Sequence, residues 1–409
     1  MTLFKKPNIF FESWIILGCF LLIIIFGLHP LERDDIFITF RYSDNLVKGN
    51  GFVYNPGDPY LGTTTPLYAL ILALSHFVSG NLLVNAAFIS GISLWGCIVI
   101  IYFVYRHYDL SLVGCLFGFL ISRSIIIDSS LGMESTFFMF LVLFFIWLYW
   151  RGHSVWAGII GGLSVLTRPE GVFLVFVLVV WDIISRRRFN FRLYGGLCIP
   201  LLPWSIFSLI YFHTLIPRTV AVKYIHGNMG WRNTFWNDLW NIYFAHQKAL
   251  WISTALGLLS IFLSRRKPFI IAAAFIVIYL IAYGITGVPS YIWYYVPVIM
   301  VFAVFASEGI IRPIYLLLGR YPKILSGLKW TAVLLLLGLT VYKAQGFQGI
   351  QSLTRTSRAD LYQLTTWIRD NTPKDAKVMH NEIGVLGYYS HRQIVDTFGL
   401  ANSGICLST

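Results

Sequence analysis

Long apolar segments separated by short polar or basic loops make up most of this sequence. Apolar runs of roughly 17–25 residues are long enough to cross a bilayer as helices. The pattern therefore predicts a polytopic membrane protein with about eleven spans. The predicted spans are residues 11–28, 82–104, 110–127, 135–150, 154–167, 171–185, 193–213, 247–263, 268–286, 293–311 and 330–345.

Lysines and arginines orient these spans, because short loops rich in Lys and Arg stay on the cytoplasmic side. Lys5 and Lys6 precede the first span, and further basic runs follow the sixth and the eighth. The segment 66–78 is apolar but short, and counting it as a span would put basic loops on both faces. We therefore expect a juxtamembrane helix there. With this count, two long polar intervals, 30–66 and 214–246, lie on the outer face.

The first outer loop, residues 30–66, contains more charged and turn-forming residues than a simple connection between two helices needs. Asp34 and Asp35 stand side by side near its start. Residues 36–47 place apolar and charged positions at the helical period, which predicts an amphipathic helix. Turn-forming residues follow at 55–59. Acidic residues held at the mouth of a membrane bundle indicate chemistry at the membrane surface.

Composition narrows the class of protein. Of the 409 residues, 57% are hydrophobic and 12% are charged, and the mean hydropathy is +0.70. These values exclude an ordinary soluble protein. The net charge of +13 lies in short loops, where it indicates orientation and contact with anionic membrane lipids, so no nucleic-acid partner is expected. The five cysteines form no CxxC pair, which favours packing roles over disulfides or a metal site.

Residues 346–409 differ in composition from the membrane domain, which we place at residues 1–345. The elements predicted in this C-terminal part are a helix at 358–370, strands at 377–379 and 393–396, and a short helix at 383–389. The expected fold is thus an all-α polytopic membrane protein with a small C-terminal α/β extracytoplasmic segment. About 60 residues is small for an independent domain, so this segment either packs on the membrane domain or is incomplete.

Six motifs in chain order give the sequence a family resemblance. They lie at residues 34–58, 63–68, 131–135, 166–171, 293–297 and 381–400. On these motifs the chain resembles the GT-C superfamily of integral membrane glycosyltransferases. It is most similar to bacterial polyprenyl-phosphate-sugar-dependent transferases of the mycobacterial arabinofuranosyltransferase type. One departure is Gly132-Met133-Glu134, where the family has Gly-Leu-Glu.

The resemblance implies a function. The donor would be a sugar on a polyprenyl phosphate, and the acceptor a cell-envelope glycan, lipid or protein. Transfer would occur at the plasma (inner) membrane, in a site that faces the periplasm or exterior. We expect a single displacement with inversion, in which an Asp deprotonates the acceptor and cations take the charge of the leaving phosphate.

Three acidic residues are the candidates for the reacting groups. The resemblance carries the catalytic base onto Asp34 or Asp35, with a small preference for Asp34. The alternative is that both only begin the amphipathic helix. Glu134 either binds a sugar hydroxyl or a metal, or is an N-terminal acid of the fourth span.

Several cations and aromatic rings are candidates for binding the donor. Arg168 either binds the donor phosphate or forms an internal ion pair with Glu170. Arg41 either points to the site or is solvated. Arg218 and Lys223 are further candidates, because cations suit a lipid phosphate. Tyr294 and Tyr295 either bind the donor or belong to the interfacial belt, where aromatic residues are common.

Two questions stay open at the level of sequence. The histidines show no metal-ligand spacing, so no metal site is predicted, although a divalent cation held by carboxylates is not excluded. The competing class of protein is a transporter or flippase of lipid-linked sugars. A transporter would place its functional charges at mid-membrane in broken helices, whereas here the acidic residues cluster in outer loops.

Overall fold

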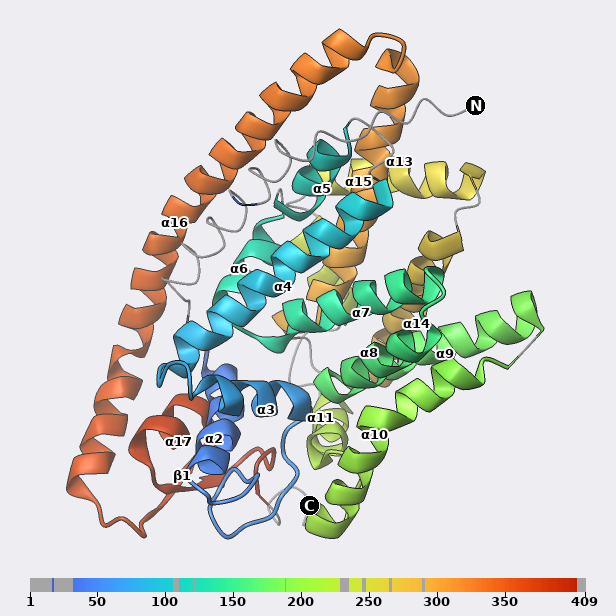
Figure 1. The fold of residues 1–409 in the computed structure, drawn as a ribbon. Helices are drawn as coiled ribbons and strands as arrows, with labels where there is room; N and C mark the ends of the chain where they lie inside the picture. Colours follow the sequence, from blue (N-terminus) through green and yellow to red (C-terminus); the bar gives the residue numbers. More distant parts are fainter. Residues whose placement is uncertain are drawn as a thin grey trace.

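A computed structural model describes Leu17 and residues 32–105, 110–120, 122–187, 189–228, 235–244, 248–264, 267–288 and 291–402. The predicted first span, 11–28, lies outside the described residues except for Leu17. Figure 1 shows a long helical bundle, with α2 and α17 together at one end and α16 along one side.

The first outer loop contains the predicted amphipathic helix, α2 (Asp34–Val47). It begins two residues earlier than expected, so Asp34 and Asp35 occupy its first turn, where the helix dipole favours carboxylates. Gly49 and Gly51, both with positive φ, follow its end. Helix α3 (Pro66–Ser75) starts at its proline and is the short apolar helix predicted at 66–78. Its place beside the membrane stays a prediction.

Apolar helices occupy most of the remaining predicted spans. They are α4 (Leu82–Tyr105), α7 (Glu134–Trp150), α8 (Ser154–Thr167), α9 (Gly171–Trp181) continued by η1 (Asp182–Arg186), α10 (Phe191–Phe212), α13 (Lys248–Ser264), α14 (Lys267–Thr286), and α15 (Val296–Leu318) preceded by η3 (Ile292–Tyr294). Within the described ranges, four helices are long and apolar enough to cross a membrane, or five if a bent pair counts as one. The predicted number of about eleven crossings stays a prediction.

Two predicted spans differ from the structure. The third breaks into α5 (Ser111–Leu120) and α6 (Arg123–Leu131), at the point where Ser122 and Arg123 interrupt the apolar run. The eleventh is part of α16 (Pro322–Asn371), which also includes the helix predicted separately at 358–370. No proline follows Pro322 within α16, so nothing in this sequence ends the helix between its apolar and polar halves.

The second outer loop is largely helical. It contains α11 (Arg218–Asn228), α12 (Phe235–Asp238) and η2 (Leu239–Phe244). The amide of Arg218 donates to the Leu61 carbonyl (3.1 Å), and the Thr219 hydroxyl donates to the Gly62 carbonyl (2.8 Å). These bonds fix the start of α11 against the first outer loop.

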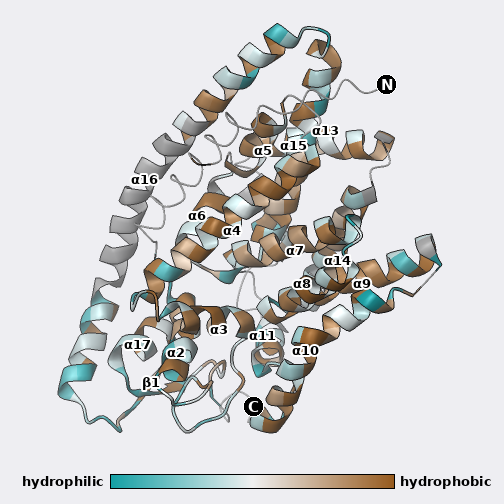
Figure 2. Cartoon of the chain, in the orientation of Figure 1, coloured by the Kyte–Doolittle hydropathy of each residue, from teal (hydrophilic) through white to brown (hydrophobic). Residues whose placement is uncertain are grey.

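The C-terminal elements confirm the predicted strand–helix–strand order. Strand β1 (Lys377–His380) pairs in parallel with β2 (Gln393–Asp396), with Lys377 opposite Gln393, and α17 (Gly384–Ser390) forms the crossover. A two-stranded sheet has little stability alone, and here α17 packs on α2. Figure 2 shows that hydrophobic residues predominate in most helices of the bundle, whereas hydrophilic residues gather at helix ends and in the C-terminal loops.

Candidate active site

The two adjacent carboxylates at the start of α2 have different surroundings. Asp34 accepts hydrogen bonds from the backbone amides of Gly384 (2.9 Å, to Oδ2) and Val385 (2.8 Å, to Oδ1). Both of its oxygens therefore cap the first turn of α17. Burial raises the pKa of the Asp34 carboxyl above its ordinary value, against these amide hydrogen bonds, which lower it.

Asp35 is the next position of α2, about 100° around the helix from Asp34. No hydrogen bond or ion pair joins its side chain to any of the residues that the structure describes. On α11, the ammonium of Lys223 donates to the Tyr294 hydroxyl (3.1 Å) and lies over the rings of Tyr291 and Tyr294. Burial alone would lower the pKa of Lys223, but Tyr294, Tyr291 and the Asp35 carboxylate together raise it. A carboxylate of α2 and an ammonium of α11, neither of them paired with a counter-ion among the described residues, therefore interact through their charges.

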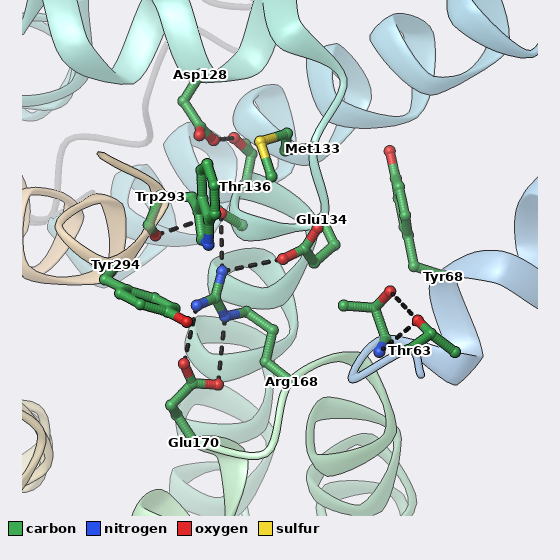
Figure 3. Close-up of polar contacts among 12 residues, drawn as sticks. Thr63, Tyr68, Asp128, Met133, Glu134, Thr136, Arg168, Glu170, Trp293 and Tyr294 are labelled. Atoms are coloured by element: carbon green, nitrogen blue, oxygen red, sulfur yellow. Dashed lines mark hydrogen bonds and ion pairs between the residues drawn. The ribbon is translucent and has the colours of Figure 1, made fainter. Parts of the chain in front are cut away.

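A buried charge network forms the floor of the same region. The Arg168 guanidinium lies between two carboxylates, with Nη1 3.0 Å from Glu134 Oε1 and Nη2 2.8 Å from Glu170 Oε1. Arg168 is 3% exposed, and it also donates to Ser135 Oγ (3.0 Å). Tyr283 donates a short hydrogen bond to Glu170. Figure 3 shows Arg168 between the two glutamates, with the Tyr294 ring beside it.

The C-terminal ends of two helices, α6 and α8, bring this network together. Gly132 has a positive φ of 68° and ends α6, so the chain turns sharply and α7 begins at Glu134. A Cβ at Gly132 would come within 2.8 Å of the Ala86 Cβ, so α4 packs closely there. Helix α8 ends at Thr167 because Pro169 disfavours helical backbone at Arg168, whose φ of −151° is extended.

Aromatic and hydroxyl side chains line the sides of the site. Tyr294 lies between Lys223 and Arg168, whose guanidinium carbon is 5.6 Å from its ring centroid. Thr63 and Tyr68 lie on the opposite side of Glu134 in Figure 3. The Tyr68 hydroxyl donates to the Gly132 carbonyl (2.6 Å). Carboxylate, hydroxyl and aromatic groups in one place suit a sugar, which offers hydroxyls to bind and an apolar face to stack.

Asp128 is a further buried carboxylate next to this network. It is 2% exposed, and its Oδ2 accepts from the Thr136 hydroxyl (3.1 Å), while Oδ1 has no hydrogen-bond partner. Among the described residues, no three His, Cys, Asp or Glu side chains gather as metal ligands. The alternative of a carboxylate-held divalent cation gains no support from this part of the chain.

The structure puts three of the predicted donor-binding residues elsewhere. Arg41 is buried and donates to the carbonyls of Tyr54 (2.6 Å), Arg392 (2.6 Å) and Gly387, so it is neither solvated nor available to a phosphate. Tyr295 is buried in the core, and its hydroxyl donates to the Phe235 carbonyl (2.9 Å).

Arg218, the third of these residues, is exposed at the start of α11. Its guanidinium lies over the Tyr60 ring (5.7 Å). Arg168, by contrast, is at the site, in the internal ion pair that was its second interpretation.

Sequence reasoning missed three contributors to this site. Tyr283 lies on α14, far along the chain from its partner Glu170, so no local pattern joins them. Thr63 and Tyr68 belong to a motif that the sequence analysis identified without assigning either residue a role. Proline and threonines before an apolar helix are equally typical of an ordinary helix start, so local sequence held no further signal.

Comparison with known proteins finds a similar curated sequence and solved structures of similar fold. The chain is 26% identical over 278 residues to the terminal β-(1→2)-arabinofuranosyltransferase of Mycobacterium tuberculosis (strain ATCC 25618 / H37Rv). The match covers 60% of this chain and 44% of the relative, so the chain spans less than half of that protein. Residues 348–406 match a family described as a domain of unknown function, DUF8728.

Solved structures with the same fold include ArnT from Cupriavidus metallidurans, both bound to undecaprenyl phosphate and in the apo state. The TM-score is 0.63 in each case, at 13% sequence identity. The similarity covers 95% of this chain and 86% or 87% of ArnT. The chain therefore shares the fold of ArnT and is similar in sequence to a mycobacterial arabinofuranosyltransferase, in agreement with the family resemblance of its motifs.

Proposed function

We propose that this protein transfers a sugar from a polyprenyl-phosphate donor to a cell-envelope glycan, lipid or protein. The observation that carries the proposal is the arrangement of Asp35 and Lys223. Among the described residues, the carboxylate has no hydrogen-bond or ion-pair partner, and the cation contacts two tyrosines, Tyr291 and Tyr294, but no carboxylate. A glycosyl transfer at a phosphate ester needs these two groups, a base for the acceptor and a cation for the leaving phosphate.

In the proposed reaction Asp35 accepts the proton of an acceptor hydroxyl. The hydroxyl oxygen attacks the anomeric carbon and forms the new glycosidic bond. The bond between that carbon and the donor phosphate oxygen breaks at the same time, and polyprenyl phosphate leaves with its negative charge near Lys223. A single displacement of this kind inverts the anomeric configuration. The proton then passes from Asp35 to solvent.

We assign Glu134 a role in holding the sugar. Its Oε1 is bound by Arg168, and it lies between that arginine and the side of the site formed by Thr63 and Tyr68. A carboxylate so placed can accept hydrogen bonds from sugar hydroxyls. Arg168 itself is saturated by two carboxylates, so its part is to hold Glu134 in position and not to bind phosphate.

The relatives support the substrate class. The similar mycobacterial protein is an arabinofuranosyltransferase, and ArnT was crystallised with undecaprenyl phosphate. We extend this to a protein of the plasma membrane whose site opens toward the periplasm or exterior, because the basic loops then lie in the cytoplasm. Residues 1–345 would form the catalytic domain, and residues 346–409 an extracytoplasmic one.

Donor consumption by purified protein in lipid tests the proposal. We expect release of polyprenyl phosphate from one member of a panel of polyprenyl-phosphate sugars when envelope extract supplies the acceptor. A transporter would instead move a lipid-linked sugar across sealed vesicles without cleaving it. Movement without release for every donor would contradict the enzyme.

The dependence of donor affinity on pH tests whether Lys223 binds the donor phosphate. The pKa of Lys223 is raised, so its charge persists as the pH rises, and wild-type donor affinity should not fall between about pH 7 and about pH 9. Lys223→His should bind donor more weakly throughout this range, because an imidazole with a pKa of about 6.5 is mostly neutral there. Equal affinities would exclude Lys223 from the phosphate site.

A further inference from the structure

The C-terminal segment contacts the first turn of α2, the middle of this helix and the loop that follows it. Its contacts come from α17, β2 and the turn that follows, and we call residues 383–401 the C-terminal clamp. We infer that this clamp is a positioning element that sets the direction of Asp35, and that Asp34 and Arg41 are its positioning residues. The inference rests on the proposed function of Asp35.

The first contact is at the catalytic end of α2. The amides of Gly384 and Val385 donate to the two oxygens of Asp34, at 2.9 and 2.8 Å. The backbones are so close that a Cβ on Gly384 would overlap the Asp34 carbonyl oxygen. Only glycine allows this approach. These bonds cap the first turn of α17 and at the same time tie the Asp34 side chain, in the first turn of α2, to the clamp.

The second contact holds the middle of α2 and the loop that follows this helix. Arg41 donates to the carbonyls of Gly387 and Arg392, and its guanidinium also stacks over the Tyr54 ring at 4.5 Å. The Asn55 side chain forms two hydrogen bonds with the backbone of Ile394, at 2.9 and 3.0 Å. Breaking these bonds would leave a buried guanidinium without partners, which costs free energy. Arg41 therefore holds the two segments together.

Further hydrogen bonds complete the clamp. The Tyr54 hydroxyl donates to the Ile383 carbonyl (2.6 Å), and the Tyr60 hydroxyl donates to the Gly399 carbonyl (3.1 Å). The clamp therefore contacts five residues of the first outer loop, from Asp34 to Tyr60. Asp34 and Arg41 are seven residues apart and so lie on one face of α2. Because both are bonded to the clamp, this face is held against it, which fixes the rotation of α2 about its own axis as well as its position.

Rotation matters because of the spacing of the two aspartates. Adjacent residues on a helix point about 100° apart. With Asp34 fixed on α17, Asp35 points to a different side of α2, and we infer that this is the side of Lys223. If α2 turned freely, either carboxylate could face the site and neither would be held. The matched family at 348–406 covers the whole clamp, so this inference gives that segment a role in the reaction.

The test replaces Gly384 by Ala, which forces α17 away from Asp34 without touching the site. Gly195→Ala is the matched control, because a Cβ there meets no neighbouring atom. For Gly384→Ala we expect kcat to fall about a hundredfold while donor KM changes less than about threefold. Hydrogen exchange of the α2 amides should quicken in the same variant, and both readouts should match wild type in the control.

The two readouts separate the possible failures. Unchanged α2 exchange in Gly384→Ala would overturn the clamp itself. Faster exchange with full turnover would overturn its effect on Asp35. If wild type transfers no sugar from any donor, the proposed function fails, and faster α2 exchange would then still report the clamp as a structural element.

Discussion

Arg168 shows how a single residue can determine the shape of the site. It is almost fully buried and is flanked by Glu134 and Glu170. Burying these charges is tolerable only because each has a partner. Removing the arginine would leave two carboxylates together in a buried place, and they would repel each other.

Arg168→Met should therefore destabilise the fold strongly, by about 3–5 kcal/mol, measured as a lowered unfolding midpoint of the protein in detergent. Arg320→Gln, at an exposed arginine far along the chain, is the control and should leave the midpoint unchanged. An unchanged midpoint for Arg168→Met would show that the network does not support the bundle. Glu134 would then need another means of being held in position.

At the same scale, the sequence could not decide between Asp34 and Asp35. Both occupy the first turn of a predicted amphipathic helix, and local sequence sets neither the rotation of that helix nor its neighbours. The partner that distinguishes them, Gly384, lies 350 residues away. For the same reason the sequence left two interpretations of Arg41 open, and the position of Arg41 in the structure matches neither of them.

Among the elements, small residues decide which helices pack closely. A Cβ on Gly257 of α13 would overlap the Phe305 carbonyl oxygen of α15, and one on Gly309 would overlap the Ser253 carbonyl oxygen. Close contact through facing small residues is the usual means of helix association in membranes, where the hydrophobic effect gives helices little preference for each other over lipid.

Gly257→Val should separate α13 from α15 and destabilise the protein by about 1–3 kcal/mol or more. Gly327→Val is the comparison, because a Cβ there meets open space. The measurement is the thermal unfolding midpoint of each variant in the same detergent. Equal midpoints would mean that α13 can shift without cost.

Element boundaries were predicted well where a proline, glycine or charge ended an apolar run. Helix α8 (Ser154–Thr167) and strand β2 (Gln393–Asp396) have the predicted ends. The prediction failed where a hydropathy change was taken for a structural end. Helix α16 continues from apolar to polar sequence without a break, since helical hydrogen bonding does not depend on which solvent surrounds it.

For the whole molecule, sequence and structure agree on a helical membrane bundle with a small C-terminal segment packed on it. The sequence predicts, from the loop charge that orients the spans, that the acidic motifs lie on one face, and this stays a prediction. It could not show that the floor of the site combines α7, the α8–α9 turn and α14. That arrangement depends on contacts between segments more than a hundred residues apart.

The central claim is that Asp35 is the base, and a paired measurement tests it most directly. Polyprenyl phosphate release and donor binding would be compared for wild type, Asp35→Asn and Asp34→Asn in lipid. We predict that Asp35→Asn loses about 10²–10⁴-fold in turnover with donor binding retained, and that Asp34→Asn loses less. Full turnover in Asp35→Asn, or a larger loss in Asp34→Asn with donor still bound, would contradict the account and make Asp34 the base.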